Sequence, residues 1–132
     1  MVFQIDFKSG KPAYLQLVDQ VRYAAASGVL RPGDPLPGIR PLAEELRINR
    51  NTLAKAYAEL EAQGVIETIP GKGCFLAHTA SPFSKQEKHK LLLTEIDEAV
   101  VTAHNLQVDP EAFLALVRER LDYFERKAKE PR

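Results

Sequence analysis

The stretch from residue 36 to residue 64, LPGIRPLAEELRINRNTLAKAYAELEAQG, constrains the fold of this chain more than any other. It holds two short patterns in which apolar residues recur at helical spacing, one within Pro41–Leu46 and one from Leu53 to Leu60. Only Arg47-Ile48-Asn49 separates them. A link this short forces two helices to cross steeply, with Ile48 filling the angle, which is the geometry of a helix-turn-helix.

The signals at the ends of the second helix predict which side chains it exposes. Asn49 is a strong N-cap, whose oxygen can accept from the N–H of Asn51 or Thr52, and Gly64 fits a left-handed residue after the last turn. With Leu53, Ala56, Tyr57 and Leu60 buried, the start of this helix exposes donor-rich side chains suited to a phosphate or a base edge. An ordinary solvated first turn would have the same composition. The exposed residues are Arg50, Asn51, Thr52 and Lys55.

A β-hairpin is expected directly after these helices. Two β-prone runs, Val65–Ile69 and Cys74–Ala77, flank the turn Pro70-Gly71-Lys72-Gly73. Helix, turn, helix and hairpin is the order of a winged helix-turn-helix, with the hairpin as the wing. Lys72 lies between two glycines that lack β-carbons, so it can approach a sugar-phosphate backbone closely.

Residues 12–76 resemble the DNA-binding domain of the GntR family of bacterial regulators. The resemblance is carried by many fixed spacings over about half the chain: Pro12-Ala-Tyr-Leu-Gln-Leu, Gly28-Val-Leu-Arg-Pro-Gly-Asp, Leu36-Pro-Gly-Ile-Arg-Pro-Leu-Ala, Asn49-Arg-Asn-Thr-Leu with Ala56-Tyr57 and Leu60, and Gly71-Lys-Gly-Cys-Phe.

This resemblance implies roles for particular residues. It places Arg40, Arg50, Asn51 and Thr52 where the family contacts its operator, and Gly71 where the wing meets the minor groove. The chain departs from the family pattern at two positions. Gly38 stands where the family usually has serine, so a side-chain cap or phosphate contact is missing. Ala54 stands where some members carry a base-contacting arginine, so their operator sequence does not carry over.

The remaining N-terminal residues are expected to support the reading helix. Phe3, Ile5 and Phe7 alternate with polar residues and predict a short strand or extended arm. A first helix follows, with an apolar stripe that ends at Gly28; the stripe is Tyr14, Leu17, Val18, Val21 and Ala25. We therefore expect residues 1–78 to form one winged helix-turn-helix domain.

Residues 79–132 are expected to form a second module, a two-helix hairpin. After a polar connector over His78–Gln86, one helix should run from about Ser84 to His104. Asp109 as N-cap and Pro110 at the first helical position predict a second helix, to about residue 128. Each helix has one apolar stripe; the residues of the two stripes that we expect at a dimer interface are Leu92, Ile96, Val100, Phe113, Val117, Leu121 and Phe124.

Two helices cannot enclose a core of their own. Packing of the hairpin against its copy in a second chain would bury both stripes and give a homodimer. The alternative is that the hairpin folds back on its own winged helix. Within the family, so short a helical C-terminus resembles the YtrA-like subfamily, which implies a module that mainly dimerises and lacks a large ligand pocket. A small-molecule effector is compatible with this module, but no ligand chemistry identifies one.

The charge of the chain does not by itself predict a nucleic-acid partner. Lys and Arg number 18 and Asp and Glu also number 18, so the formal net charge is zero. Any positive face must come from the local placement of Arg40, Arg50, Lys55 and Lys72, and operator binding should then need a dimer. The neutral charge supports an alternative, a winged helix that binds protein and not DNA.

Other kinds of site find little support. Cys74 is the only cysteine and reads as a small packed residue, with a redox sensor as the alternative. His78, His89 and His104 are too far apart in sequence for helical pairing around a metal. No nucleophile lies in a recognisable catalytic arrangement. We expect no metal, no cofactor and no enzymatic activity, and the lack of a signal peptide or long apolar run predicts a cytoplasmic protein with no membrane partner.

These observations predict a mainly α-helical protein with a small β-wing, acting as a homodimeric transcriptional regulator, and by expectation a repressor. Its partner would be a double-stranded DNA operator with an imperfect inverted repeat. Arg50 and Arg40 are the main base-reading candidates, and Asn51 and Thr52 would contact both bases and phosphates. The phosphate or positioning candidates are Lys55, Lys72 and Tyr14.

Overall fold

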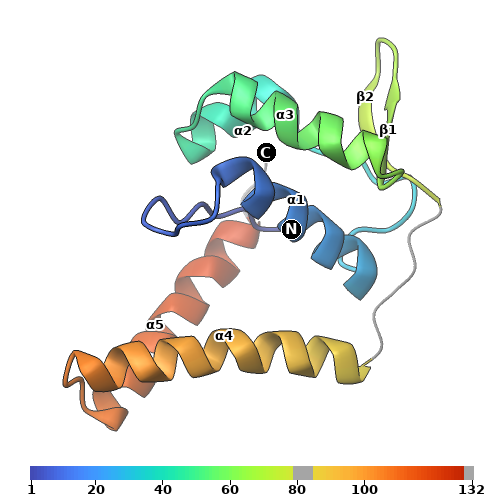
Figure 1. The fold of residues 1–132 in the computed structure, drawn as a ribbon. Coiled ribbons are helices and arrows are strands. Elements are labelled where there is room, and N and C mark those ends of the chain that lie inside the picture. The colour runs from blue at the N-terminus through green and yellow to red at the C-terminus, as the bar shows by residue number, and fades with distance from the viewer. Residues whose placement is uncertain (79–84, 130–132) are drawn as a thin grey trace. The chain divides into compact units, whose positions relative to one another are not determined.

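The computed structural model describes residues 1–78 and 85–129. The described residues form two compact units, one over residues 1–78 and one over residues 85–129. Its elements are helices α1 (Ala13–Ser27), α2 (Ile39–Leu46) and α3 (Arg50–Ala62), strands β1 (Ile66–Ile69) and β2 (Gly73–Leu76), and helices α4 (Lys85–Asn105) and α5 (Pro110–Lys129) (Figure 1). The expected fold class, mainly α-helical with a two-stranded wing, is confirmed. The expected connector and the start of its helix at Ser84 fall partly on residues 79–84, which lie outside the described residues.

Helix α3 is the centre of the first unit, because it packs against α1, α2 and β1. Its predicted stripe is buried, and it joins a single apolar core that includes side chains from every element of the unit. Because this stripe is buried, the opposite side of α3 faces solvent. The largest fully buried side chains are Phe3, Leu17, Val21, Leu42, Leu53, Leu60, Ile66 and Leu76.

The first six residues form an extended arm on α1. Of the two expected forms, a short strand or an extended arm, the arm is therefore the correct one. The side-chain oxygen of Gln20 accepts from the backbone N–H of Gln4 at 3.0 Å, and Gln16 accepts from Asp6 in the same way at 2.9 Å. Each glutamine also donates from its amide nitrogen to the backbone carbonyl of the same residue. These bonds seat Phe3 in the core, whereas Phe7 is 69% exposed and does not continue the alternation.

The β-hairpin extends beyond the C-terminal end of α3 (Figure 1). Strands β1 and β2 pair antiparallel, with Ile66 opposite Leu76 and Ile69 opposite Gly73. A third segment, which the sequence patterns did not predict as a strand, joins β2 on its other edge: Pro35 pairs with Phe75, and two backbone hydrogen bonds of 2.9 Å flank this bridge. The wing is therefore attached to the segment that leads into α2 as well as to α3.

In the second unit, α4 and α5 are joined by a tight turn and diverge from it (Figure 1). Asp109 caps α5 as predicted, because its carboxylate accepts from the N–H groups of Glu111 and Ala112. The hairpin is open, and no described residue of either helix is buried. None of the helices in the described part of the chain is long and apolar enough to cross a lipid bilayer.

Candidate nucleic-acid interface

The corner between α2 and α3 is set by the backbone of three residues. Arg47 adopts a left-handed conformation, with φ 58° and ψ 45°, and ends α2. The N–H of Ile48 then donates to the carbonyl of Ala43 at 3.0 Å, and the Ile48 side chain packs against the core. This hydrogen bond and its apolar contact turn the chain sharply. The turn confirms the predicted helix-turn-helix and the role of Ile48 in filling the angle.

Asn49 begins α3 as the sequence predicts. Its Oδ1 atom accepts from the backbone N–H of Asn51 at 2.7 Å, which satisfies one of the free donors at the helix start. The side chains of Arg50 and Asn51 are exposed, and that of Thr52 is half-buried. The positive end of the helix dipole therefore lies at the surface together with an exposed arginine and an exposed amide, which favours an anionic ligand.

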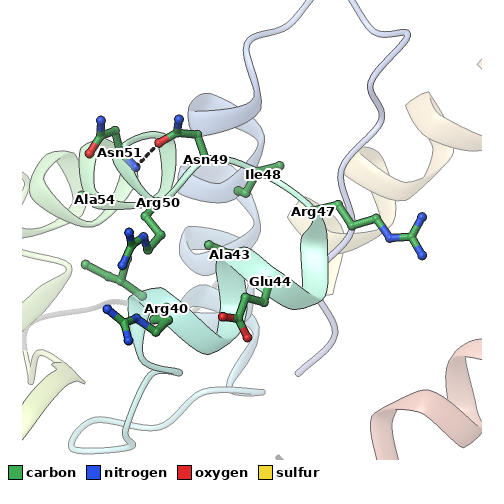
Figure 2. A pocket seen from close by; sticks show the side chains of 10 residues that line it. Arg40, Ala43, Glu44, Arg47, Ile48, Asn49, Arg50, Asn51 and Ala54 are labelled. Atoms are coloured by element: carbon green, nitrogen blue, oxygen red, sulfur yellow. Dashed lines mark hydrogen bonds between the residues drawn. The ribbon is translucent and has the colours of Figure 1, made fainter.

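A concave pocket lies between α2 and the start of α3 (Figure 2). The side chains of Arg40 and Arg50 lie next to each other on one side of it. Within the described residues neither arginine has a carboxylate within ion-pairing distance, so their charge is available to a ligand. The full lining is Ile39, Arg40, Ala43, Glu44, Arg47, Ile48, Asn49, Arg50, Asn51 and Ala54.

Lys55 and Tyr14, two candidates far apart in the sequence, are in contact. The Nζ atom of Lys55 lies 4.0 Å from the centroid of the Tyr14 ring, a cation–π interaction between α3 and α1. Lys55 remains exposed, so the contact restrains its side chain without removing its charge from solvent. Tyr14 thereby fixes where the lysine charge lies on the surface of α3.

The tip of the wing is a tight turn from Ile69 to Lys72, whose N–H donates to the Ile69 carbonyl at 2.9 Å. Pro70 and Gly71, with φ 76° at the glycine, give the residue pattern of a type II turn, which requires a positive φ at its third position. Both Gly71 and Lys72 are exposed. The hydroxyl of Thr68 donates to Glu61 at 3.0 Å, which links the wing to α3.

The structure brings some of the predicted DNA-contacting residues together and keeps others apart. Arg40, Arg50 and Asn51 line one pocket, whereas Thr52, Lys55, Tyr14, Gly71 and Lys72 lie outside its lining. Sequence reasoning missed Arg47, which lines the same pocket. A positive residue after the last apolar position of α2 was visible in the sequence, but its left-handed backbone was not.

The residues expected at a dimer interface lie on the second unit with their apolar surface exposed. On α4, Leu92 is 61% exposed, and on α5 Leu121 is 61% exposed. Phe113 and Phe124 are half-buried, and together with Val117 and Leu121 they line a shallow apolar pocket on α5. Within residues 1–78 and 85–129, no three His, Cys, Asp or Glu side chains gather as a metal site requires.

Comparison with known proteins identifies similar chains. Residues 13–76 match the family described as "Bacterial regulatory proteins, gntR family". Over 118 residues, 89% of this chain and 91% of the relative, the sequence is 33% identical to the HTH-type transcriptional repressor YtrA of Bacillus subtilis (strain 168). This similarity extends well beyond the family match and includes much of the helical second unit.

Two solved structures are similar over most of the chain. One is a transcriptional antiterminator from Listeria monocytogenes EGD-e, with a TM-score of 0.58, 35% identity, and coverage of 91% of this chain and 90% of that one. The other is YtrA from Sulfolobus acidocaldarius, a GntR-family transcription factor, with a TM-score of 0.53 and 30% identity over 73% of this chain and 97% of that one. These relatives are regulators of transcription and not enzymes.

Proposed function

This chain belongs to the GntR family of bacterial regulatory proteins and is a transcriptional regulator, and on that premise we propose that it is a repressor that binds an inverted-repeat operator as a homodimer. It would act in the cytoplasm, on double-stranded DNA. The observation that carries the proposal is the position of Arg40 and Arg50, side by side in an exposed pocket at the start of α3 with no ion-pair partner among the described residues.

Arg50 and Arg40 read bases in this proposal. The N-terminal end of α3 enters the major groove, where a guanidinium can donate two hydrogen bonds to the O6 and N7 atoms of guanine. Asn51 and Thr52, on the same helical turn, contact an adenine edge or a phosphate. Because Ala54 contributes only a methyl group to the pocket lining, the floor of the pocket is free to admit a base edge.

The other candidates position the helix on the duplex. Lys55, restrained by the ring of Tyr14, meets a phosphate next to the reading helix. Lys72, at the exposed tip of the wing, meets the backbone where Gly71 allows close approach to the minor groove. Contacts to phosphate carry no sequence information, but they fix the register from which the arginines read.

In this proposal the second unit forms the dimer interface. Exposed apolar side chains on α4 and α5 would pack against the same surface of a second copy, because a two-fold interface is made of one patch used twice. Two copies present two reading helices, and a two-fold symmetric dimer reads two half-sites about one helical turn apart or a multiple of it. The inverted repeat follows from this symmetry. A dimer also doubles the local positive charge that a chain of zero net charge presents to DNA.

The test is to replace Arg50 and measure binding by fluorescence anisotropy. The probes are a labelled duplex from the region upstream of the protein's own gene and a scrambled duplex of the same composition. Arg50→Ala should weaken binding to the upstream duplex by about 5- to 100-fold and reduce the preference over the scrambled one. Arg22→Ala removes an exposed arginine outside the pocket lining and should leave both affinities unchanged. Unchanged affinity in Arg50→Ala contradicts the proposed reading helix.

The neutral net charge favours one other function, a winged helix that binds protein alone. The two functions differ in a mobility-shift assay with the same upstream duplex. Binding that survives competition by scrambled DNA supports the regulator. No shift at concentrations well above those typical of specific operators, about 10⁻⁸ M, supports the protein-binding alternative.

A further inference from the structure

Arg47 has an unusual backbone for its residue type. Among the described residues other than glycine, only Arg47 and Gln107 have a positive φ, and each has a value of 58°. In this left-handed region the β-carbon of an L-residue crowds the following carbonyl oxygen, so glycine is the residue that adopts it without penalty. The backbone at position 47 therefore favours a residue other than the one present.

Helix α3 ends in the same way as α2 but with the favoured residue. In α3, the N–H of Val65 donates to the carbonyl of Leu60 at 2.9 Å, across Gly64 with φ 75°. In α2, the N–H of Ile48 donates to Ala43 at 3.0 Å, across Arg47. In each case the N–H donates to the carbonyl of the residue five positions earlier, which is the hydrogen bond that defines a Schellman motif. The two ends differ in what the left-handed residue carries: a long cationic side chain on α2 and none on α3.

The side chain of Arg47 belongs to the surface that would face DNA. It is exposed, lines the same pocket as Arg40 and Arg50, and has no carboxylate within ion-pairing distance in the described part of the chain. Figure 2 shows it extending from the C-terminal end of α2, away from the other two arginines. Positions 40 and 47 are about 10 Å apart along a helix axis, so Arg47 would meet a different part of the duplex.

We propose that Arg47 is a further DNA-contacting residue, which binds a backbone phosphate at the far end of the pocket and so positions the start of α3 in the major groove. A guanidinium suits this role because its planar donors match the oxygens of a phosphate in pairs. The inference rests on the proposed DNA-binding function. It adds that the contact is independent of sequence, because phosphates are the same at every base pair.

Two substitutions separate the charge from the backbone conformation. Arg47→Gln keeps a β-carbon at the left-handed position and removes the charge, whereas Arg47→Gly removes both. Arg22→Gln makes the same chemical change at an exposed arginine of α1 outside the pocket lining. Binding of the full chain to the upstream and scrambled duplexes is measured by anisotropy over a series of salt concentrations. Melting temperatures are measured for every variant.

Arg47→Gln should weaken binding to both duplexes by a similar factor, about 3- to 10-fold at low salt, and lower the salt slope by about one per subunit. Arg47→Gly should weaken binding as much, with a melting temperature that is unchanged or raised by up to about 4 °C. Arg22→Gln should stay within about twofold of the unsubstituted chain, because it removes no contact to DNA.

Several results would overturn the inference. Unchanged binding in Arg47→Gln, beside a loss in Arg50→Ala, would reject the Arg47 contact and leave the proposed function intact. A loss confined to one duplex would assign Arg47 to base reading and reject the phosphate contact. A lower melting temperature in Arg47→Gly would reject the argument from its backbone. If the unsubstituted chain binds neither duplex, the proposed function fails and the Arg47 contact fails with it.

Discussion

The hydroxyl group of Tyr57 donates a 2.6 Å hydrogen bond to the carbonyl oxygen of Pro37. Tyr57 is on the buried side of α3, with 5% of its surface exposed, and Pro37 directly precedes Gly38, the N-cap of α2. The bond therefore ties the middle of α3 to the start of the helix that carries Arg40. It fixes the two arginine-bearing segments relative to each other from inside the domain.

Tyr57→Phe tests how much this hydrogen bond contributes to the stability of the domain. The substitution keeps the buried ring but leaves the Pro37 carbonyl without its donor, so the free energy of unfolding should fall by about 1 kcal/mol. Urea denaturation measures this as a lower midpoint at an unchanged slope. Tyr123→Phe removes a hydroxyl from an exposed tyrosine, 39% accessible, and should change the value by less than about 0.5 kcal/mol. Equal effects in the two variants would show that the bond contributes nothing specific.

Asn49 allows stability and DNA binding to be separated. Asn49→Ala removes the cap of α3 and should lower the free energy of unfolding by about 1 kcal/mol. Asn49→Asp retains an oxygen that accepts from Asn51 and adds a negative charge at the positive end of the helix, so stability should be kept. Asn49 also lines the pocket, where that carboxylate would repel phosphate and pair with Arg50.

Binding to the upstream duplex should therefore fall in Asn49→Asp although the fold does not weaken. Thermal denaturation and anisotropy on the same samples measure both quantities. Retention of full affinity in Asn49→Asp would mean that the pocket does not face DNA.

Lys72 should contribute to affinity and not to sequence preference. Lys72→Ala removes the one charge at the exposed tip of the wing, so binding should weaken evenly on the upstream and scrambled duplexes, and the salt slope should fall by about one per subunit. Lys90→Ala, on α4, serves as the comparison and should leave the slope unchanged. A change in relative affinity between the two duplexes in Lys72→Ala would indicate base reading by the wing instead.

Leu121 tests the proposed dimer. Leu121→Glu places a carboxylate in the exposed apolar surface of α5, which should weaken self-association more than about tenfold because the charge would be buried without a partner. Ala115→Glu introduces the same group about a third of a turn around the helix from Leu121, on the exposed polar side, and should sediment as the unsubstituted chain does. Dimers of undiminished stability in Leu121→Glu would place the interface elsewhere.

The helix starts could be predicted because the signals for them are local. Asn49 and Asp109 were each predicted as N-caps from the residue type and its position before an apolar pattern, and each side chain accepts backbone N–H groups in the structure. The buried stripe of α3 was predicted from spacing alone. The exposure of Arg50 followed from that burial, because one side of a helix determines the other.

Features that depend on distant parts of the chain could not be read in this way. Residues 31–35 have the composition of a Pro/Gly loop and were expected to be one, yet Pro35 pairs with Phe75, because the unpaired edge of β2 lies beside it in the fold. The contact of Lys55 with Tyr14 depends on how α1 packs against α3. The left-handed residue that ends α2 was missed because arginine gives no signal for it, whereas Gly64 was predicted for the equivalent place in α3.

The N-terminal arm is bound to α1 through its own main-chain atoms, which form hydrogen bonds with two glutamine side chains of the helix. Since Gln20 binds both the N–H and the carbonyl of residue 4, the identity of the side chain there is of little consequence, while the path of the polypeptide is fixed. Proline is the exception, because it has no N–H to offer the glutamine oxygen. The first residues of the arm are therefore a structural part of the domain, because they hold Phe3 in the core. A fusion partner placed directly before Phe3 would have to leave this arm in its place on α1.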